Sequence, residues 1–256
     1  MKPLIVANWK CNPTTLKGAK LLFGSVKKGV KNIKRAEVVI CPPFVYLPVL
    51  GASAFAKGYG GLTFGSQDCF WEKSGAFTGE TSPIMLKDIG CQYVIIGHSE
   101  RRRYFGETDE MINKKIKAAL KAKLKPIFCI GETEEEREKG ETPEILKSQI
   151  EKGLNKISKK EIKNIVIAYE PVWAIGTGKP CDIDEAQKMG LLIRKIIAKF
   201  YSRSISENLP ILYGGSVDSK NAAGYVKEAQ LQGLLVGGAS LDPKEFIKLV
   251  KDVTKT

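Results

Sequence analysis

The chain has 256 residues, 43% of them hydrophobic, which is enough apolar material for the core of one large domain. This composition excludes a disordered chain, and the scattered placement of 25 Gly and 12 Pro excludes a collagen-like repeat. The formal net charge of +13 favours anionic partners: a nucleic acid, a membrane surface or a small phosphorylated molecule. Most lysines stand singly on predicted helix faces without interleaved aromatic residues, so we interpret this charge as a solvated surface and expect no nucleic acid partner.

Cysteine and histidine usage narrows the chemistry further. The six cysteines show no CxxC spacing, which argues against a zinc ribbon and against a thioredoxin-like redox site. A single His, at position 98, excludes an HExxH motif and any His-rich metal site. The apolar run after Met1 is too short for a signal peptide. We therefore expect a cytoplasmic protein with reduced thiols and without a His-rich metal site.

Short apolar runs recur along the whole chain, and each is followed by a longer segment of helical pattern. The runs are mostly continuous, which is typical of strands buried on both faces of a parallel sheet. The predicted strands, in chain order, are Leu4–Trp9, Glu37–Cys41, Leu62–Gly65, Tyr93–Gly97, Pro126–Ile130, Ile165–Tyr169, Ile211–Tyr213 and Leu234–Val236. The uncharged stretch 38–56 approaches the length of a membrane span, but it contains three prolines. We predict a strand, a break and a short helix there, and no membrane association.

The segments between the runs carry helix-boundary signals. In chain order they are an N-cap at Ser82-Pro83, a left-handed cap at Gly90, an N-cap at Thr142-Pro143, a capping box at Asp182 and Glu185, and an N-cap at Asp242-Pro243. An apolar stripe at three-to-four spacing follows the capping box. These signals predict helices between successive strands.

Eight strand-then-helix units in 256 residues average 32 residues each, which fits an α/β fold of the (β/α)₈ barrel type. No linker divides the chain, so we predict a single barrel domain over residues 1–256. The alternative is an open, doubly wound sheet. The nucleotide fingerprints that often accompany that fold are missing, because Cys181 stands where the third Gly after Gly176 and Gly178 would be required.

Polar side chains follow several of the predicted strands. In a barrel of this type, reacting groups lie at the carboxyl ends of the strands. Period-two geometry predicts that Lys10 shares a strand face with Asn8, and it places His98 on the face of Ile96. Glu170 follows the sixth strand. Because burying such groups apart from one another is costly, we predict that they converge at one mouth of the barrel.

Five motifs, in order along essentially the whole chain, resemble the triosephosphate isomerase family. They are Asn8-Trp9-Lys10, Gly97-His98-Ser99-Glu100-Arg101-Arg102, the run from Ala168 to Lys179, Tyr213-Gly214-Gly215-Ser216, and the run from Leu235 to Ser240. The twelve-residue run from Ala168 is the most specific of them. No motif position departs from the family pattern.

The resemblance implies interconversion of dihydroxyacetone phosphate and D-glyceraldehyde 3-phosphate, in glycolysis and gluconeogenesis, through an enediolate and without metal or cofactor. It implies that Glu170 is the base that removes a proton beside the carbonyl. His98 is then a neutral donor to the enediolate, with its cationic form disfavoured by a helix beginning near Ser99. Lys10 supplies positive charge, and Asn8 orients the site.

By the same resemblance, the substrate phosphate is bound by Ser216 and by backbone groups of Gly176, Gly237 and Gly238. The segment Pro171–Lys179 resembles a lid with hinges at 171–173 and 177–179, which closes over the intermediate and excludes water. Glu132 and Tyr213 are then partners of Trp173 and of the closed lid.

The segment 72–80 resembles the family's intersubunit loop, which implies a homodimer. In that arrangement Thr78 lies near Asn12 of the partner subunit, and Cys11 lies close to the interface. We interpret Cys11 as a small packed residue rather than a reactive thiol.

Other functions stay open at this point. A Schiff-base aldolase on the same barrel would use Lys10 as its nucleophile. A serine hydrolase is disfavoured because the sequence around Ser99 lacks the second Gly of a nucleophile elbow. A nucleic-acid-binding protein is suggested only by the charge of +13.

Overall fold

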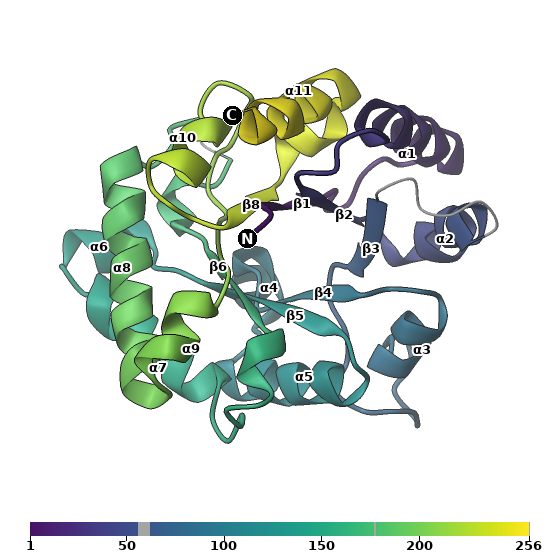
Figure 1. The fold of residues 1–256 in the computed structure, drawn as a ribbon. Coiled ribbons are helices and arrows are strands. Elements are labelled where there is room, and N and C mark those ends of the chain that lie inside the picture. Colours follow the sequence, from purple (N-terminus) through teal and green to yellow (C-terminus); the bar gives the residue numbers. More distant parts are fainter. Residues whose placement is uncertain (56–61, 177, 256) are drawn as a thin grey trace.

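Eight parallel strands close into a barrel, with each strand paired to its neighbours in chain order and β8 paired to β1 (Figure 1). The computed structural model describes residues 1–55, 62–176 and 178–255, without the side chains of 52–55. The strands are β1 (Leu4–Asn8), β2 (Glu37–Cys41), β3 (Leu62–Ser66), β4 (Tyr93–Ile96), β5 (Lys125–Ile130), β6 (Val166–Tyr169), β7 (Ile211–Tyr213) and β8 (Gly233–Val236). The predicted barrel fold is confirmed, and no strand end lies more than one residue from its predicted position.

Helices surround the barrel as an outer ring (Figure 1). They are α1 (Leu16–Val30), α2 (Leu47–Phe55), α3 (Pro83–Asp88), α4 (Ser99–Phe105), α5 (Asp109–Lys121), α6 (Glu134–Glu138), α7 (Thr142–Gly153), α8 (Ile183–Phe200), α9 (Arg203–Asn208), α10 (Ala222–Lys227) and α11 (Pro243–Thr254). In the part of the chain that the structure describes, no helix combines the length and apolar character that crossing a bilayer requires.

The strands are buried on both faces because apolar side chains point alternately into and out of the barrel. In β1, Ile5 and Ala7 pack outward against the helices, whereas Leu4 and Val6 point inward. The inward-facing set forms a separate cluster that fills the barrel: Leu4, Val6, Val39, Cys41, Tyr93, Ile95, Ile127, Cys129, Val166, Ala168, Leu212 and Leu235. This packing accounts for the mostly continuous apolar runs of the strands.

Three of the predicted helix boundaries are confirmed. The Ser82 side chain accepts a hydrogen bond from the Met85 amide at the start of α3, and Asp242 caps α11 in the same way. Gly90 follows α3 with a φ of +87°, in the left-handed region that favours glycine.

The predicted N-cap at Thr142 is wrong, because Thr142 is already the first residue of α7 and no side chain caps that helix. The preceding residue, Glu141, has helical dihedrals (φ −85°, ψ −1°), so Thr142 does not adopt the extended backbone of a cap.

At α8, the Asp182 side chain accepts from the amides of Asp184 and Glu185, so the N-cap is confirmed, but the described contacts include no reciprocal bond to the Glu185 side chain that would complete the predicted capping box. Among the described residues, a capping box with both reciprocal bonds stands at the start of α6, between Thr133 and Glu136. This box was not predicted from the sequence.

Candidate active site

A cavity of about 360 Å³ opens at the carboxyl ends of the strands. All of the residues singled out in the sequence for catalysis or substrate binding line it: Asn8, Lys10, His98, Glu170, Gly176, Ser216, Gly237 and Gly238. They come from β1, β4 and β6 to β8 and from the loops that follow these strands. The predicted convergence at one mouth of the barrel therefore occurs.

The route by which His98 reaches the cavity differs from the prediction. Ile96 packs outward, so a His98 on the same strand face would point away from the barrel mouth. Strand β4 ends at Ile96, and Gly97 takes a φ of +76° that turns the chain. Lys10 likewise lies beyond the end of β1 and has a φ of +52°, so strand periodicity does not place it either.

The Glu170 carboxylate is almost completely buried, with its side chain 2% exposed. Its Oε2 accepts a hydrogen bond of 3.0 Å from the Ser99 backbone amide. Its Oε1 lies 3.2 Å from His98 Nε2, yet among the described residues it receives no hydrogen bond of acceptable geometry. A carboxylate oxygen without such a bond keeps its lone pairs available to a proton of the substrate.

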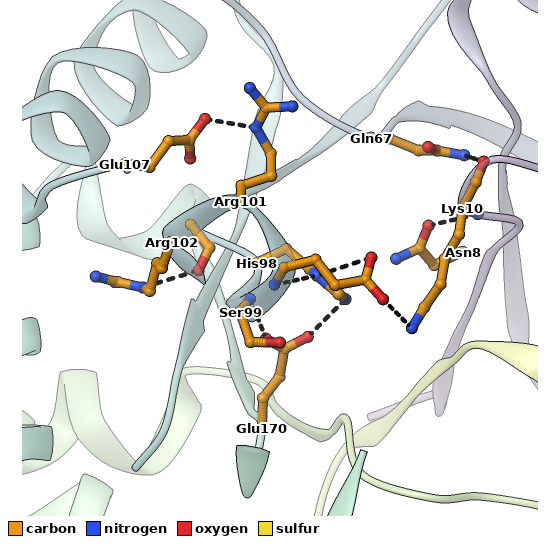
Figure 2. A network of polar contacts seen from close by, with 11 residues as sticks. Asn8, Lys10, Gln67, His98, Ser99, Arg101, Arg102, Glu107 and Glu170 are labelled. Atoms are coloured by element: carbon orange, nitrogen blue, oxygen red, sulfur yellow. Dashed lines mark hydrogen bonds and ion pairs between the residues drawn. The ribbon is translucent and has the colours of Figure 1, made fainter. Parts of the chain in front are cut away.

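The protonation of the His98 ring follows from its contacts (Figure 2). His98 is the N-cap of α4, and its Nδ1 accepts a hydrogen bond of 3.2 Å from the Glu100 amide. A ring nitrogen that accepts a hydrogen bond carries no proton, so the neutral ring bears its proton on Nε2. That N–H is on the side of the ring that faces Glu170.

Lys10 is held at both its backbone and its ammonium group (Figure 2). Its amide donates to Asn8 Oδ1 over 3.1 Å, and its carbonyl accepts from Gln67 Nε2 over 2.9 Å. Its Nζ lies 2.6 Å from Glu100 Oε1, in the first turn of α4. Neither Glu100 nor Gln67 was predicted from the sequence to contact Lys10. The sequence pointed to Glu100 only through its place inside one of the five motifs.

Comparison with known proteins places the chain in a family. The family model of triosephosphate isomerase matches residues 3–253. The chain belongs to the triosephosphate isomerase family. It is 48% identical to the triosephosphate isomerase of Dictyoglomus thermophilum over 250 residues, which is 98% of this chain and 99% of the relative. It is 47% identical to the same enzyme of Geotalea uraniireducens, over 98% of each chain. The resemblance found in the motifs is confirmed.

The segment that resembles the lid of triosephosphate isomerases begins at Pro171 and includes Thr177, which lies outside the described residues. Trp173 Nε1 donates a hydrogen bond of 2.8 Å to Glu132 Oε1, as expected of these partners. Burial raises the pKa of Glu132, and the bond from Trp173 opposes that shift. The Tyr213 hydroxyl accepts a bond of 3.0 Å from the Cys181 amide, just beyond the segment that resembles the lid.

Two glycines that the sequence analysis did not assign to the site lie against Glu170. A Cβ at Gly131 would stand 1.8 Å from the Glu170 carbonyl oxygen, and one at Gly214 would stand 2.9 Å from its Cγ. The backbone must approach this residue closely from both neighbouring strands. In the sequence, such glycines cannot be distinguished from glycines that only form turns.

Among the described residues, no three or more His, Cys, Asp or Glu side chains are placed to hold a metal ion together. The five cysteines after Cys11 are buried, and Cys11 is exposed.

Proposed function

We propose that this chain interconverts dihydroxyacetone phosphate and D-glyceraldehyde 3-phosphate by proton transfer through an enediolate. The observation that carries the proposal is the arrangement of Glu170, His98 and Lys10 around one cavity: a buried carboxylate, a ring N–H and an ammonium group. This is the set of groups that an aldose–ketose isomerisation needs.

Glu170 is the proposed base. It takes a proton from the carbon next to the substrate carbonyl and returns it to the neighbouring carbon, while the hydroxyl proton passes from one substrate oxygen to the other, so the reaction is balanced without an external redox partner. Its Oε1 lies 3.2 Å from His98 Nε2 but accepts no hydrogen bond of acceptable geometry from the described residues, which supports this role. The bond from the Ser99 amide to Oε2 holds the carboxylate beside the ring of His98 before substrate arrives.

His98 and Lys10 are the proposed donors to the oxygen atoms of the enediolate. As negative charge develops on these oxygens, the Nε2–H of His98 and the ammonium group of Lys10 stabilise it in a site from which water is excluded. The bond that the Lys10 amide donates to Asn8 Oδ1 supports an orienting role for Asn8.

The substrate phosphate is proposed to lie against the backbone of Gly176, Gly237 and Gly238 and the side chain of Ser216. These residues line the same cavity as Lys10, and a Cβ at Gly237 would lie 3.3 Å from Lys10 Cε. Ser216 Oγ donates a bond of 2.8 Å to the Ala174 carbonyl, which ties the loop after β7 to the proposed lid Pro171–Lys179. Lid closure then excludes water from the enediolate.

A coupled assay for triose phosphate conversion, with no metal or cofactor added, tests the proposal. Glu170→Asp moves the carboxylate back by roughly 1 Å, and we expect kcat to fall about 10²-fold while the fold is retained. The matched control is Glu138→Asp, the same substitution at an exposed position of α6, where kcat stays unchanged. Wild-type turnover in Glu170→Asp would contradict the assignment of the base.

An aldolase that uses Lys10 is the rival on the same barrel. Lys10 Nζ is engaged by Glu100 Oε1 at 2.6 Å, whereas a Schiff-base lysine has to present a free amine to its substrate. Borohydride trapping of a covalent adduct would support the rival, and failure to trap one supports the isomerase.

A homodimer in the cytoplasm is proposed as the functional form. Support comes from exposed apolar side chains: Phe77, in the segment 72–80, is 44% exposed, and Val45 and Met85 are 72% and 54% exposed. Such groups mark an interface when they cluster. Sedimentation velocity measures the assembly directly, and a monomer of 28.2 kDa at micromolar concentration would contradict it.

A further inference from the structure

The two peptide units that flank His98 are both bonded to Arg102, which lies four residues further along the chain, in α4. The Arg102 amide donates a hydrogen bond of 3.2 Å to the His98 carbonyl. The Arg102 side chain reaches back, and its Nε donates a bond of 3.0 Å to the Gly97 carbonyl (Figure 2). The sequence analysis gave Arg102 no role, although it stands inside one of the five motifs.

The side-chain bond acts on the turn that brings His98 to the cavity. Gly97 is buried, follows the last residue of β4 and has a φ of +76°. Its carbonyl belongs to the same planar peptide unit as the His98 amide. Because that unit does not twist, holding the oxygen fixes the direction in which the chain leaves the turn and carries the imidazole ring.

The guanidinium group of Arg102 also contacts the next strand and the next helix of the barrel. Its Nη1 lies 2.6 Å from Asp109 Oδ1, in the first turn of α5, and its Nη2 donates a longer bond of 3.4 Å to the Cys129 carbonyl of β5. The side chains of Arg102 and Asp109 are 21% and 15% exposed. Because the donors of a guanidinium lie in one rigid plane, these contacts and the bond to Gly97 hold one another in a single arrangement.

We propose that Arg102 is a positioning residue for the isomerisation: it holds the peptide units on both sides of His98 against β5 and α5, so that the ring enters the cavity in one orientation. The inference rests on the proposed function, in which His98 donates to the enediolate. A donor stabilises developing charge only if it is in place before the reaction begins. A displacement of the ring by roughly 1 Å corresponds to about a 10²-fold loss in rate.

Arg102→Met is the direct test, because it keeps an unbranched side chain and removes all of its hydrogen-bond donors. The carbonyls of Gly97 and Cys129 and the carboxylate of Asp109 then lose this partner. We expect kcat to fall between about 10- and 100-fold, because the ring is no longer held. We expect KM to stay within about twofold of the wild type, since the loss affects a donor to the enediolate rather than the groups that bind the phosphate.

Arg102→Lys tests the same role with a smaller change. It keeps a positive charge beside Asp109, but it offers one ammonium group in place of the guanidinium fork. We expect it to fold as the wild type does by circular dichroism, with kcat reduced about 2- to 12-fold, the range that one lost hydrogen bond corresponds to. A wild-type kcat in this variant would overturn the proposal even if Arg102→Met did not fold.

The His98 ring can be observed directly, because it is the single histidine of the chain. In protein that carries isotope-labelled histidine, nitrogen NMR shifts report which ring nitrogen bears the proton and what each one bonds to. We expect shifted or broadened ring signals in both Arg102 variants. A reduced kcat with ring signals identical to those of the wild type would overturn the proposal, because Arg102 would then act through another group.

Arg194→Met is the matched control. The Arg194 guanidinium also bonds to two backbone carbonyls, those of Ser206 and Leu209, and to one side-chain oxygen, Gln232 Oε1. Leu209 and Gln232 lie just before β7 and β8, at the end of the barrel opposite the cavity. We expect this variant to unfold at a lower temperature and to keep the wild-type kcat and ring signals. Equal losses of kcat in Arg194→Met and Arg102→Met would overturn the proposal, because general destabilisation would account for both.

The outcomes separate this inference from the proposed function. A wild-type chain without isomerase activity would overturn the proposed function, whereas the ring signals of His98 would still show whether Arg102 places the ring. An active wild type, with kcat unchanged in both Arg102 variants, would overturn the role of Arg102 alone.

Discussion

At the scale of single residues, missing Cβ atoms decide where the proposed base lies. Gly131 follows β5, and its Cα faces the backbone of Glu170 so closely that a methyl group would overlap the carbonyl oxygen, at 1.8 Å. The clash is with backbone, which cannot rotate away as a flexible side chain can. Glycine at this position is therefore part of how Glu170 is placed, although it bears no reacting group.

Gly131→Ala is expected to push β5 and β6 apart at their carboxyl ends and to displace Glu170. A displacement of roughly 1 Å at the base corresponds to about a 10²-fold loss in kcat, and thermal unfolding should also occur at a lower temperature. Coupled assays and circular dichroism measure the two effects.

Gly24→Ala is the matched control, because Gly24 lies inside α1 with nothing within 4 Å of an added Cβ. There the same substitution is expected to stabilise the protein by up to about 1 kcal/mol and to leave kcat unchanged. If Gly131→Ala left kcat and stability as this control does, the close approach of Gly131 to Glu170 would not be needed to place the base.

At the scale of elements, a buried group of charges fixes α4, which carries the ring of His98 at its amino end. Arg101 of α4 contacts Asp68 at 3.0 Å and Glu107 at 2.5 Å. Lys115 of α5 contacts Asp68 at 2.8 Å and also bonds to Glu107. The side chains of Asp68, Glu107 and Lys115 are between 2% and 6% exposed. The group therefore joins the loop after β3 to α4 and α5.

Lys115→Met is expected to lower the free energy of unfolding by about 3–5 kcal/mol, because it leaves two buried carboxylates with only Arg101 as a partner. Lys139→Met removes a lysine from an exposed pair with Glu135 and is expected to cost less than about 0.5 kcal/mol. Urea titration of both variants measures the difference. Similar costs in the two would mean that the buried group contributes no more than a surface pair.

The pH dependence of stability gives a second test of the same group. Burial is the main cause that raises the pKa of Asp68 from 3.8 to about 6, and the charge of Lys115 opposes it. Between these values the folded chain binds a proton at Asp68 that the unfolded chain does not. The contribution of this group to stability is therefore present below about pH 4 and lost as the pH rises through 6.

Asp68→Asn removes the titrating group, so the comparison with wild type isolates it. As the pH falls from 7 to 4, we expect the free energy of unfolding of the wild type to rise relative to that of the variant. Urea titrations of both proteins across that range measure the change. A constant difference between them would mean that Asp68 has its ordinary pKa in the folded state.

At the scale of the whole molecule, the strands were predictable because each is a continuous apolar run between polar segments, so every strand end fell within one residue. The convergence of Asn8 and Glu170 also followed from strand periodicity. Strand periodicity does not predict how His98 reaches the same cavity, because the chain turns there through a left-handed residue, Gly97. Contacts such as that between Lys10 and Glu100 join residues 90 positions apart, and residue spacing carries no information about them.

The net positive charge of the whole molecule is of the sign that attracts an anionic substrate. The formal net charge is +13, and the proposed substrate is a phosphate ester with up to two negative charges. Basic residues occur at both ends of the barrel; Lys159, Lys160 and Lys163 line a cavity before β6, at the end opposite the candidate site. A strand of this barrel spans about 15 Å. Charges at the far end therefore act on a substrate only when salt screening is weak, since the screening length is roughly 30 Å at 10 mM salt and 10 Å at 100 mM.

Salt dependence of kcat/KM distinguishes steering by the whole molecule from attraction at the cavity alone. We expect kcat/KM to fall severalfold between 10 and 200 mM sodium chloride, which is roughly the smallest rate enhancement that electrostatic steering gives. We expect kcat to change less, because steering acts on the association of substrate with the protein. Replacing Lys159, Lys160 and Lys163 with Glu lowers the net charge by six. This variant is expected to reduce kcat/KM at 10 mM salt and to match the wild type at 200 mM. Equal values for both proteins at low salt would assign the attraction to the residues of the cavity and leave the remaining charge as a solvated surface.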